Sequence, residues 1–293
     1  MFTNSPIDYI EFENHSFYLK RDDLLHRDFS GNKARKFYYY LHNDFPNITK
    51  IISKGSAQSN AMYSLSVLAK LKGWEFDYFV EHIASYLVDN PHGNYRGALD
   101  NGMRVHIDKP PTTYGNDTLF IDEGGRGEKS EFGVRLLAQE IEIWQRESSI
   151  DRLNIFLPSG TGTTALFLQK NLPSNIVYTT PCVGDKSYLI EQFKMLDSDT
   201  THHPKILTVE KKHHFGKLYR ENYKIWLKLQ LQTGVEFDLL YDPLGWRVLL
   251  SSLDILSSPT LYIHQGGILG NESMLPRYQR KYKEIINEDI LQW

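Results

Sequence analysis

The sequence has almost no cysteine: Cys182 is the only one among 293 residues. A disulfide within the chain is therefore excluded, and a reducing compartment is favoured. No apolar run approaches the roughly 18 residues that cross a membrane. Residues 1–6 have neither the basic region nor the apolar stretch of a signal peptide. We therefore expect a cytoplasmic protein without a membrane partner.

An excess of charge of one sign is also lacking. The chain carries 33 basic and 36 acidic residues, for a formal net charge of −3. A nearly neutral chain has no field that would attract nucleic acid or an anionic membrane, so a small-molecule partner is favoured. At 293 residues the chain is near the upper limit of what a single hydrophobic core supports, and we expect two domains.

Short apolar runs alternate with longer amphipathic segments along most of the chain. This alternation is typical of an α/β protein with open, mostly parallel twisted sheets flanked by helices. The amphipathic segments 131–144 and 219–231 have helical spacing. Strands are expected at 50–53, 76–80, 104–107, 118–121, 153–157, 175–178, 237–240 and 261–264.

A turn near the N-terminus delivers a lysine into a helix. Gly31 and Asn32 both tolerate left-handed backbone angles, so they can turn the chain sharply ahead of Lys33. A partly desolvated lysine at such a place loses basicity and becomes a nucleophile toward aldehydes. Lys33 is therefore a candidate covalent catalyst. A solvated residue at a helix start is the alternative.

Two later segments each have the pattern strand, polar loop, helix. Residues 54–60 follow Ile51-Ile52 and end in Gln58-Ser59-Asn60, where backbone amides and the helix dipole suit a carboxylate or a phenolic oxygen. An ordinary N-cap by Ser59 or Asn60 is the alternative. The second loop mixes glycines with hydroxyls and predicts a phosphate cup or, alternatively, a structural turn. Its residues are Ser159, Gly160, Thr161, Gly162, Thr163 and Thr164.

Histidine pairs at 202–203 and 213–214 raise the question of a metal site. Adjacent side chains diverge on any regular element, and no acidic residue or cysteine joins them at ligand spacing. We expect no metal, and solvated imidazoles at both pairs.

Six landmarks in one order carry a resemblance to a known family. The chain resembles the 1-aminocyclopropane-1-carboxylate deaminase and D-cysteine desulfhydrase family of pyridoxal-phosphate (PLP) enzymes, which have the tryptophan synthase β-like fold. Lys20-Arg21-Asp22-Asp23-Leu24 is similar to the family's K-R-[ED]-D-L segment, and Gly31-Asn32-Lys33-Ala34-Arg35-Lys36 to its G-N-K-x-R-K segment. The other matches are Gln58-Ser59-Asn60, Glu123-Gly124-Gly125, the loop 159–164, and His264-Gln265-Gly266-Gly267 for H-T-G-G.

The resemblance implies a PLP cofactor and places its contacts. Lys33 would form the Schiff base and move the α-proton, and Ser59 would serve as a proton relay. Asn60 would bond the phenolic oxygen, while Gln58, Ser59 and Asn60 would line the substrate site. The loop 159–164 would take the phosphate, and Gln265 would lie near the pyridine nitrogen. The resemblance also implies a small inserted domain at 37–122, with 1–36 and 123–293 forming the larger one.

The implied activity is that of a lyase or deaminase that converts a small amino acid into ammonia and a 2-oxo acid. The family's D-P-V-Y-[ET]-G-K segment is matched to Asp242-Pro243-Leu244-Gly245-Trp246, which has no tyrosine at the fourth place. β-Elimination from a D-amino acid is therefore expected ahead of cyclopropane opening, with Tyr241 or Trp246 as partial substitutes.

Two other functions stay open. One is a non-catalytic module that binds PLP or an amino acid. The other is a nucleotide-dependent enzyme that uses the loop 159–164, with Asp242 as its magnesium-binding acid, although the loop lacks a Walker lysine. A homodimer is compatible with the sequence.

Overall fold

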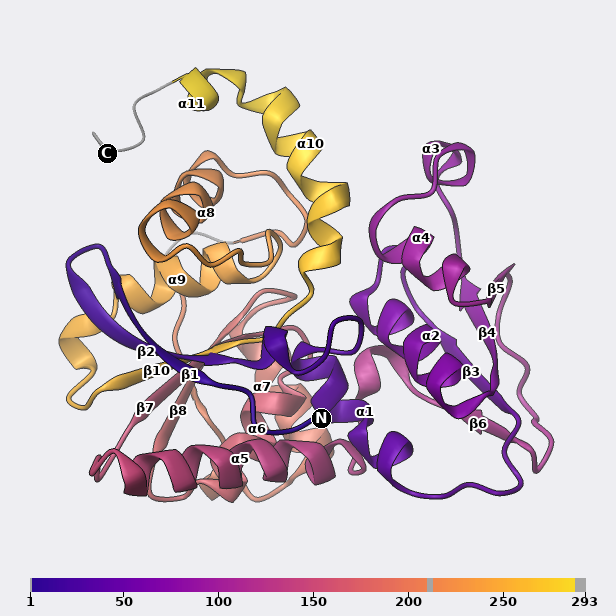
Figure 1. Cartoon of the computed structure of the whole chain (residues 1–293), viewed down its shortest axis with the longest axis horizontal. Coiled ribbons are helices and arrows are strands. Elements are labelled where there is room, and N and C mark those ends of the chain that lie inside the picture. Colours follow the sequence, from indigo (N-terminus) through magenta and orange to yellow (C-terminus); the bar gives the residue numbers. More distant parts are fainter. Residues whose placement is uncertain (1, 210–212, 288–293) are drawn as a thin grey trace.

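Two sheets, each with its own hydrophobic core, make up the molecule. The computed structural model describes residues 2–209 and 213–287, and Figure 1 shows the two sheets side by side. The larger has strand order β1-β2-β10-β7-β8-β9 and the smaller β5-β4-β3-β6. Apart from the antiparallel β1–β2 pair, the neighbouring strands run parallel. The predicted α/β fold with two open, mostly parallel sheets is confirmed.

The larger sheet is covered on both faces, because successive side chains of a strand point to opposite sides. In β7, Ile155 and Leu157 join the core under α5 and α6, whereas Phe156 joins the core under α8 and α9. The strands are β1 Ile7–Phe12, β2 His15–Arg21, β7 Asn154–Ser159, β8 Ile176–Pro181, β9 Lys205–Ile206 and β10 Thr260–His264. The helices are α5 Ser130–Glu147, α6 Thr163–Asn171, α7 Lys186–Leu196, α8 Arg220–Thr233, α9 Asp242–Leu250, α10 Asn271–Lys281 and α11 Lys283–Asn287.

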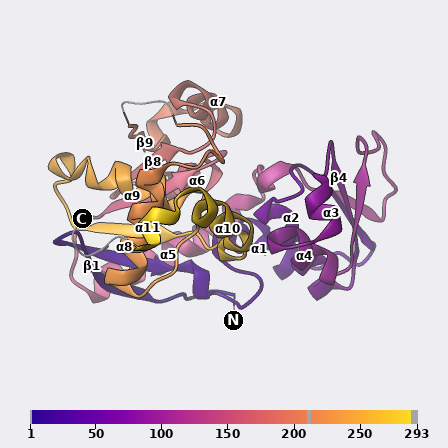
Figure 2. The same ribbon diagram turned by 90° about the horizontal axis from the view of Figure 1, so that it is seen from above.

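The smaller sheet packs on α2 and α4 through a core that also takes Phe37 from α1. Its strands are β3 Lys50–Lys54, β4 Glu75–Val80, β5 Met103–Ile107 and β6 Thr118–Phe120. The helices are α1 Gly31–His42, α2 Asn60–Lys72, α3 Ser85–Asp89 and α4 Gly93–Asp100. Seen from above, α1 lies between the two halves (Figure 2). The domain boundaries at 37 and 122 stay a prediction.

Most predicted elements are confirmed within a few residues, but the strand at 237–240 is wrong. Asp238 N donates to Asp242 Oδ2 and Leu239 N donates to Asn271 Oδ1, so side chains satisfy these amides in place of a neighbouring strand. The hairpin β1–β2 was not predicted. Its turn residues Glu13 and Asn14 have φ of 49° and 61°, the geometry of a tight two-residue hairpin turn.

Within the described residues, no helix is long and apolar enough to cross a membrane.

Candidate active site

The first turn of α1 is clamped to the turn that follows β10. Gly31 has φ of +66°, and a Cβ there would overlap the carbonyl of Gln265. Asn32 donates its backbone N–H to Gln265 O at 3.0 Å and its side-chain amide to Gln265 Oε1 at 3.1 Å. Glycine is therefore required at position 31 for both backbone angle and space. This close approach orients the next residue, Lys33.

Two lysines of α1 share one carbonyl. Lys33 Nζ and Lys36 Nζ each donate to Gly124 O at 3.1 Å. Burial lowers the pKa of Lys33 to about 8, although the nearby Glu123 carboxylate acts in the opposite direction. Burial and the charge of Lys33 lower the pKa of Lys36 as well. A low pKa makes more of the Lys33 amine available as a nucleophile near neutral pH.

The glycine loop after β7 reaches this lysine. A Cβ built on Gly124 would lie 3.7 Å from Thr161 Cγ2 and 3.9 Å from Lys33 Nζ, so the three landmarks meet. Gly162 has φ of +71° and caps α6, which directs the first amides of that helix into the loop. Buried Thr164 Oγ1 has no hydrogen-bond partner among the described residues. The loop therefore offers an unpaired hydroxyl and a helix N-terminus to an anion.

The remaining hydroxyls of this loop are partly used. Ser159 Oγ lies 2.6 Å from Thr179 Oγ1 of β8, and Thr161 Oγ1 lies 3.0 Å from Thr163 Oγ1. Ser159 thus links the end of β7 to β8. A phosphate cup formed by the backbone from Gly160 onward stays a prediction.

Of the segment 58–60, Asn60 faces the turn after β10. A Cβ on Gly267 would lie 3.4 Å from Asn60 Nδ2. Ser59 is the N-cap of α2, with Oγ accepting from Ala61 N at 3.1 Å, and Gln58 Nε2 donates to Tyr86 OH at 2.9 Å. Ser59 therefore fills the structural role that N-capping predicts. Its role in a substrate site remains a prediction.

Gln265 ties three segments together. Its Nε2 donates to Pro158 O at 2.6 Å, while its Oε1 accepts from Asn32. Both ends of the amide are thus engaged with the end of β7 and the start of α1. The predicted position of Gln265 near a pyridine nitrogen stays a prediction.

A tyrosine, Tyr241, lies beside the glycine loop. A Cβ on Gly160 would lie 3.5 Å from Tyr241 OH, so this hydroxyl lies against the glycine loop. The spacing Asp238-Leu239-Leu240-Tyr241-Asp242 has the form D-x-x-Y-acid and lies four residues ahead of the match made on Asp242-Pro243. That dipeptide instead starts α9, where proline is favoured in the first turn. Trp246 is fully buried and stacks on Tyr262, so it is part of the hydrophobic core and does not substitute for the tyrosine.

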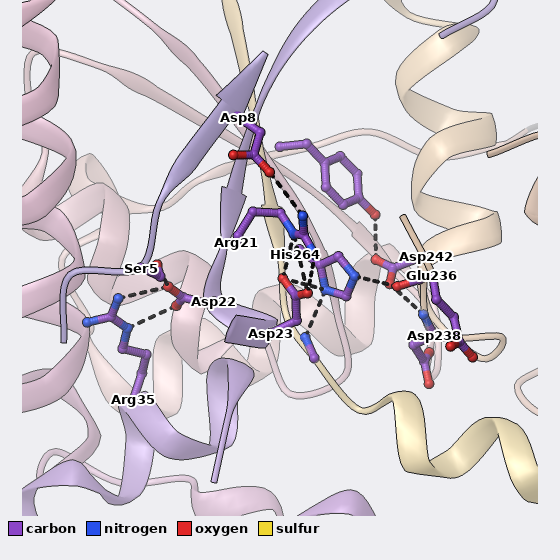
Figure 3. Close-up of polar contacts among 12 residues, drawn as sticks. Ser5, Asp8, Arg21, Asp22, Asp23, Arg35, Glu236, Asp238, Asp242 and His264 are labelled. Carbon is purple, nitrogen blue, oxygen red and sulfur yellow. Dashed lines mark hydrogen bonds and ion pairs between the residues drawn. The ribbon is translucent and has the colours of Figure 1, made fainter. Parts of the chain in front are cut away.

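Two buried carboxyl groups, Asp238 and Asp242, flank this tyrosine in sequence, and both are labelled in Figure 3. Asp238 Oδ1 accepts from Leu240 N at 2.9 Å and from Tyr241 N at 2.7 Å. Burial raises the pKa of Asp238 to about 7. Asp242 accepts from Tyr262 OH at 2.7 Å and from Asp238 N at 3.1 Å, and burial raises its pKa. Both oxygens of Asp242 thus accept hydrogen bonds in the buried interior.

A buried ionic network holds α1 in place. Arg35 donates to Asp22 Oδ1 at 2.8 Å and to Glu140 at 2.7 Å (the Asp22–Arg35 pair is drawn in Figure 3), and Lys20 pairs with Glu140 at 2.7 Å. These basic partners lower the pKa of Glu140 to about 2. Two cations and two anions balance one another, as buried charges require. The helix that carries Lys33 is thereby fixed to β2 and α5.

The histidine pairs are only partly solvated, which corrects the expectation. His203 Nε2 bonds to Asp197 O at 2.9 Å, and His213 stacks on Tyr219 with ring centroids 4.7 Å apart. Burial and Arg247 lower the pKa of His213 to about 4. No group of three potential metal ligands was found among the described residues.

Comparisons with known proteins show the fold. No family model and no curated protein matches the sequence. A solved homologue of ACC deaminase is 22% identical, with 94% of this chain and 93% of that chain covered and a TM-score of 0.74. A hydrogen sulfide-producing enzyme from Fusobacterium nucleatum is 11% identical, covering 92% and 97%, with a TM-score of 0.63. The processed form of threonine deaminase isoform 2 from Solanum lycopersicum is 12% identical, covering 94% and 82%, with a TM-score of 0.64. The chain therefore has the fold that these structures share, and the tryptophan synthase β-like fold implied by its sequence is confirmed.

Proposed function

We propose that this protein is a PLP-dependent lyase or deaminase that converts a small amino acid into ammonia and a 2-oxo acid. One observation carries the proposal: the Lys33 amine, with its pKa lowered to about 8, lies beside a glycine loop that has an unpaired buried hydroxyl and a helix N-terminus. An aldehyde that also carries a phosphate fits this pairing of nucleophile and anion cup. The names of the structural neighbours, which include an ACC deaminase homologue and a threonine deaminase, agree with the proposal.

The residues present fit PLP. The amides at the start of α6 and the unpaired Thr164 Oγ1 would hold the phosphate, with Gly160 to Thr163 closing around it. Lys33 would bind the aldehyde carbon, and Asn60 would donate to the phenolic oxygen. When bound, the cofactor supplies an electron sink for the negative charge that develops at the substrate's α-carbon.

The other groups of the site would handle the substrate and its protons. Lys33, once the substrate's own amine has replaced it, would hold a free amine that accepts the α-proton. Gln58 and Ser59 would bind the carboxylate near the N-terminus of α2, which favours an anion. Tyr241, with its hydroxyl beside Gly160, is a further acid or base candidate.

The position of Tyr241 changes the expected substrate range. The preference for β-elimination over cyclopropane opening depended on a missing tyrosine, and the Tyr241 hydroxyl beside Gly160 is a candidate for that role. We therefore propose no order between D-cysteine-like substrates and aminocyclopropane carboxylate. Release of pyruvate from the first and of 2-oxobutyrate from the second, at equal enzyme concentration, measures the choice.

Borohydride trapping tests the cofactor site. The protein would be mixed with PLP, its visible spectrum recorded, and the sample reduced with borohydride before peptide mass mapping. We expect a yellow, reducible chromophore and the pyridoxyl label on Lys33. Lys33→Ala should remove both label and turnover while the far-UV circular dichroism stays unchanged. A label on Lys36 or Lys54, or turnover by Lys33→Ala near the wild-type rate, would overturn the proposal.

A further inference from the structure

We propose that Asp238 is a positioning residue that holds the Tyr241 hydroxyl against the glycine loop. A catalytic use for that hydroxyl depends on the proposed function, whereas the positioning itself is a property of the unliganded protein. No strand or helix holds residues 237–240, which lead directly into α9. The backbone of this segment therefore needs other partners for its amides.

One carboxylate oxygen accepts hydrogen bonds from two of these amides. Asp238 Oδ1 accepts from Leu240 N at 2.9 Å and from Tyr241 N at 2.7 Å, and the Asp238 side chain is 6% exposed. An aspartate that accepts amides two and three residues later fixes a turn, because its short side chain leaves little freedom. The bond to Tyr241 N therefore sets the point from which the tyrosine side chain departs.

The tyrosine side chain then lies beside the glycine loop. Its OH and Cε1 would lie 3.5 and 3.6 Å from a Cβ on Gly160, and the Phe215 ring lies 5.2 Å from its own ring. A shift of the Tyr241 backbone by about 1 Å would carry the hydroxyl away from the loop, and misplacement of that size costs about 10²-fold in rate at an active site.

The second carboxylate oxygen of Asp238 faces the turn that follows β10. A Cβ on Gly267 would lie 3.5 Å from Asp238 Oδ2 and 3.4 Å from Asn60 Nδ2. Asp238 thus lies between Tyr241 on one side and the turn facing Asn60 on the other. A change at Asp238 is transmitted to Tyr241 by a direct bond rather than through the general stability of the core.

Neighbouring anchors keep the segment folded without Asp238. Asp242 Oδ2 accepts a hydrogen bond from Asp238 N. Asn271 Oδ1 accepts one from Leu239 N, and Asn271 Nδ2 donates one to Phe237 O. Asp238→Ala removes the two bonds to Leu240 and Tyr241 and leaves these anchors. Asp238→Asn keeps an oxygen that accepts both amides, while an uncharged NH2 group replaces Oδ2.

Nitration of the unliganded protein tests the positioning directly. Tetranitromethane attacks the phenolate, and burial raises the pKa of Tyr241, so Tyr241 should react slowly in the wild type. In Asp238→Ala we expect its nitration rate, followed by peptide mapping, to rise toward that of exposed Tyr9, which serves as internal reference. In Asp238→Asn the rate should stay at the wild-type value.

Turnover supplies the second readout. Asp238→Ala should lower kcat by about 10²-fold with KM nearly unchanged, and Asp238→Asn should restore most of kcat. Tyr262→Phe, which removes a buried bond to Asp242, is the control: it should lower the melting temperature without changing Tyr241 nitration.

Unchanged nitration of Tyr241 in Asp238→Ala, or faster nitration in folded Asp238→Asn, would overturn the positioning role. The Asp238→Asn arm decides the matter if Asp238→Ala does not fold. Faster nitration in Asp238→Ala together with an inactive wild type would support the positioning role and refute the proposed function instead.

Discussion

The two glycines of the loop at 159–164 should respond very differently to the same added methyl group. Gly162 has φ of +71°, and a Cβ there would overlap the ring of Phe193 and come within 2.6 Å of Leu189 Cδ1. The left-handed angle costs a non-glycine residue about 1 to 2 kcal/mol, and forcing a methyl into a packed core costs about 1 to 3 kcal/mol. Gly162→Ala should therefore lower the free energy of unfolding by about 2 to 5 kcal/mol.

Gly160 is the matched comparison. Its Cβ would lie 3.5 Å from Tyr241 OH and 4.0 Å from Val183 Cγ2, which are ordinary contacts. Gly160→Ala should thus change the free energy of unfolding by less than about 0.5 kcal/mol. The methyl would, however, occupy space that an anion needs. Loss of one hydrogen bond to a charged phosphate, about 1.5 to 3 kcal/mol, predicts PLP affinity at least about tenfold weaker.

Urea unfolding of the unliganded variants and spectroscopic titration with PLP measure the two effects. We expect a lower free energy of unfolding only in Gly162→Ala. In Gly160→Ala we expect weaker PLP affinity at an unchanged free energy of unfolding. Equal unfolding midpoints for the two variants would refute the steric argument. Wild-type PLP affinity in Gly160→Ala would show that the phosphate binds elsewhere.

Two further predictions concern charge. Because burial lowers the pKa of Lys33 to about 8 from 10.5, borohydride-trapped PLP incorporation should reach half its maximal rate near pH 8; a midpoint near 10.5 would contradict the desolvation. The unfolded state binds more protons than the native state between these values, so the contribution of Lys33 to the unfolding free energy should rise with pH across that window and vanish in Lys33→Met. Arg35→Ala, which leaves Asp22 and Glu140 buried without their guanidinium, should cost about 3 to 5 kcal/mol in urea unfolding. Arg96→Ala, at a half-exposed ion pair with Glu272, should cost no more than about 1 kcal/mol, and equal losses would refute the burial argument.

Local patterns in the sequence were enough to predict much of the site. Glycines at 31 and 162 both take positive φ, and Ser59 caps a helix, because backbone angle and capping depend on residue type and near neighbours. The alternation of apolar runs and amphipathic segments predicted parallel sheets, whose strand ends bring loops to one edge. Lys33 and Thr161 accordingly both lie near Gly124.

Tertiary structure alone decided how the remaining side chains are used. The bond between Asn32 and Gln265 joins residues 233 positions apart, and the Tyr241 hydroxyl meets Gly160 only because β7 and the segment before α9 converge. Residues 237–240 have the apolar pattern of a strand, yet two of their backbone amides donate to the side chains of Asp242 and Asn271 instead of to a neighbouring strand. Hydrogen-bond partners of this kind depend on which distant segments pack together, and a local pattern of apolar and polar residues does not encode that choice.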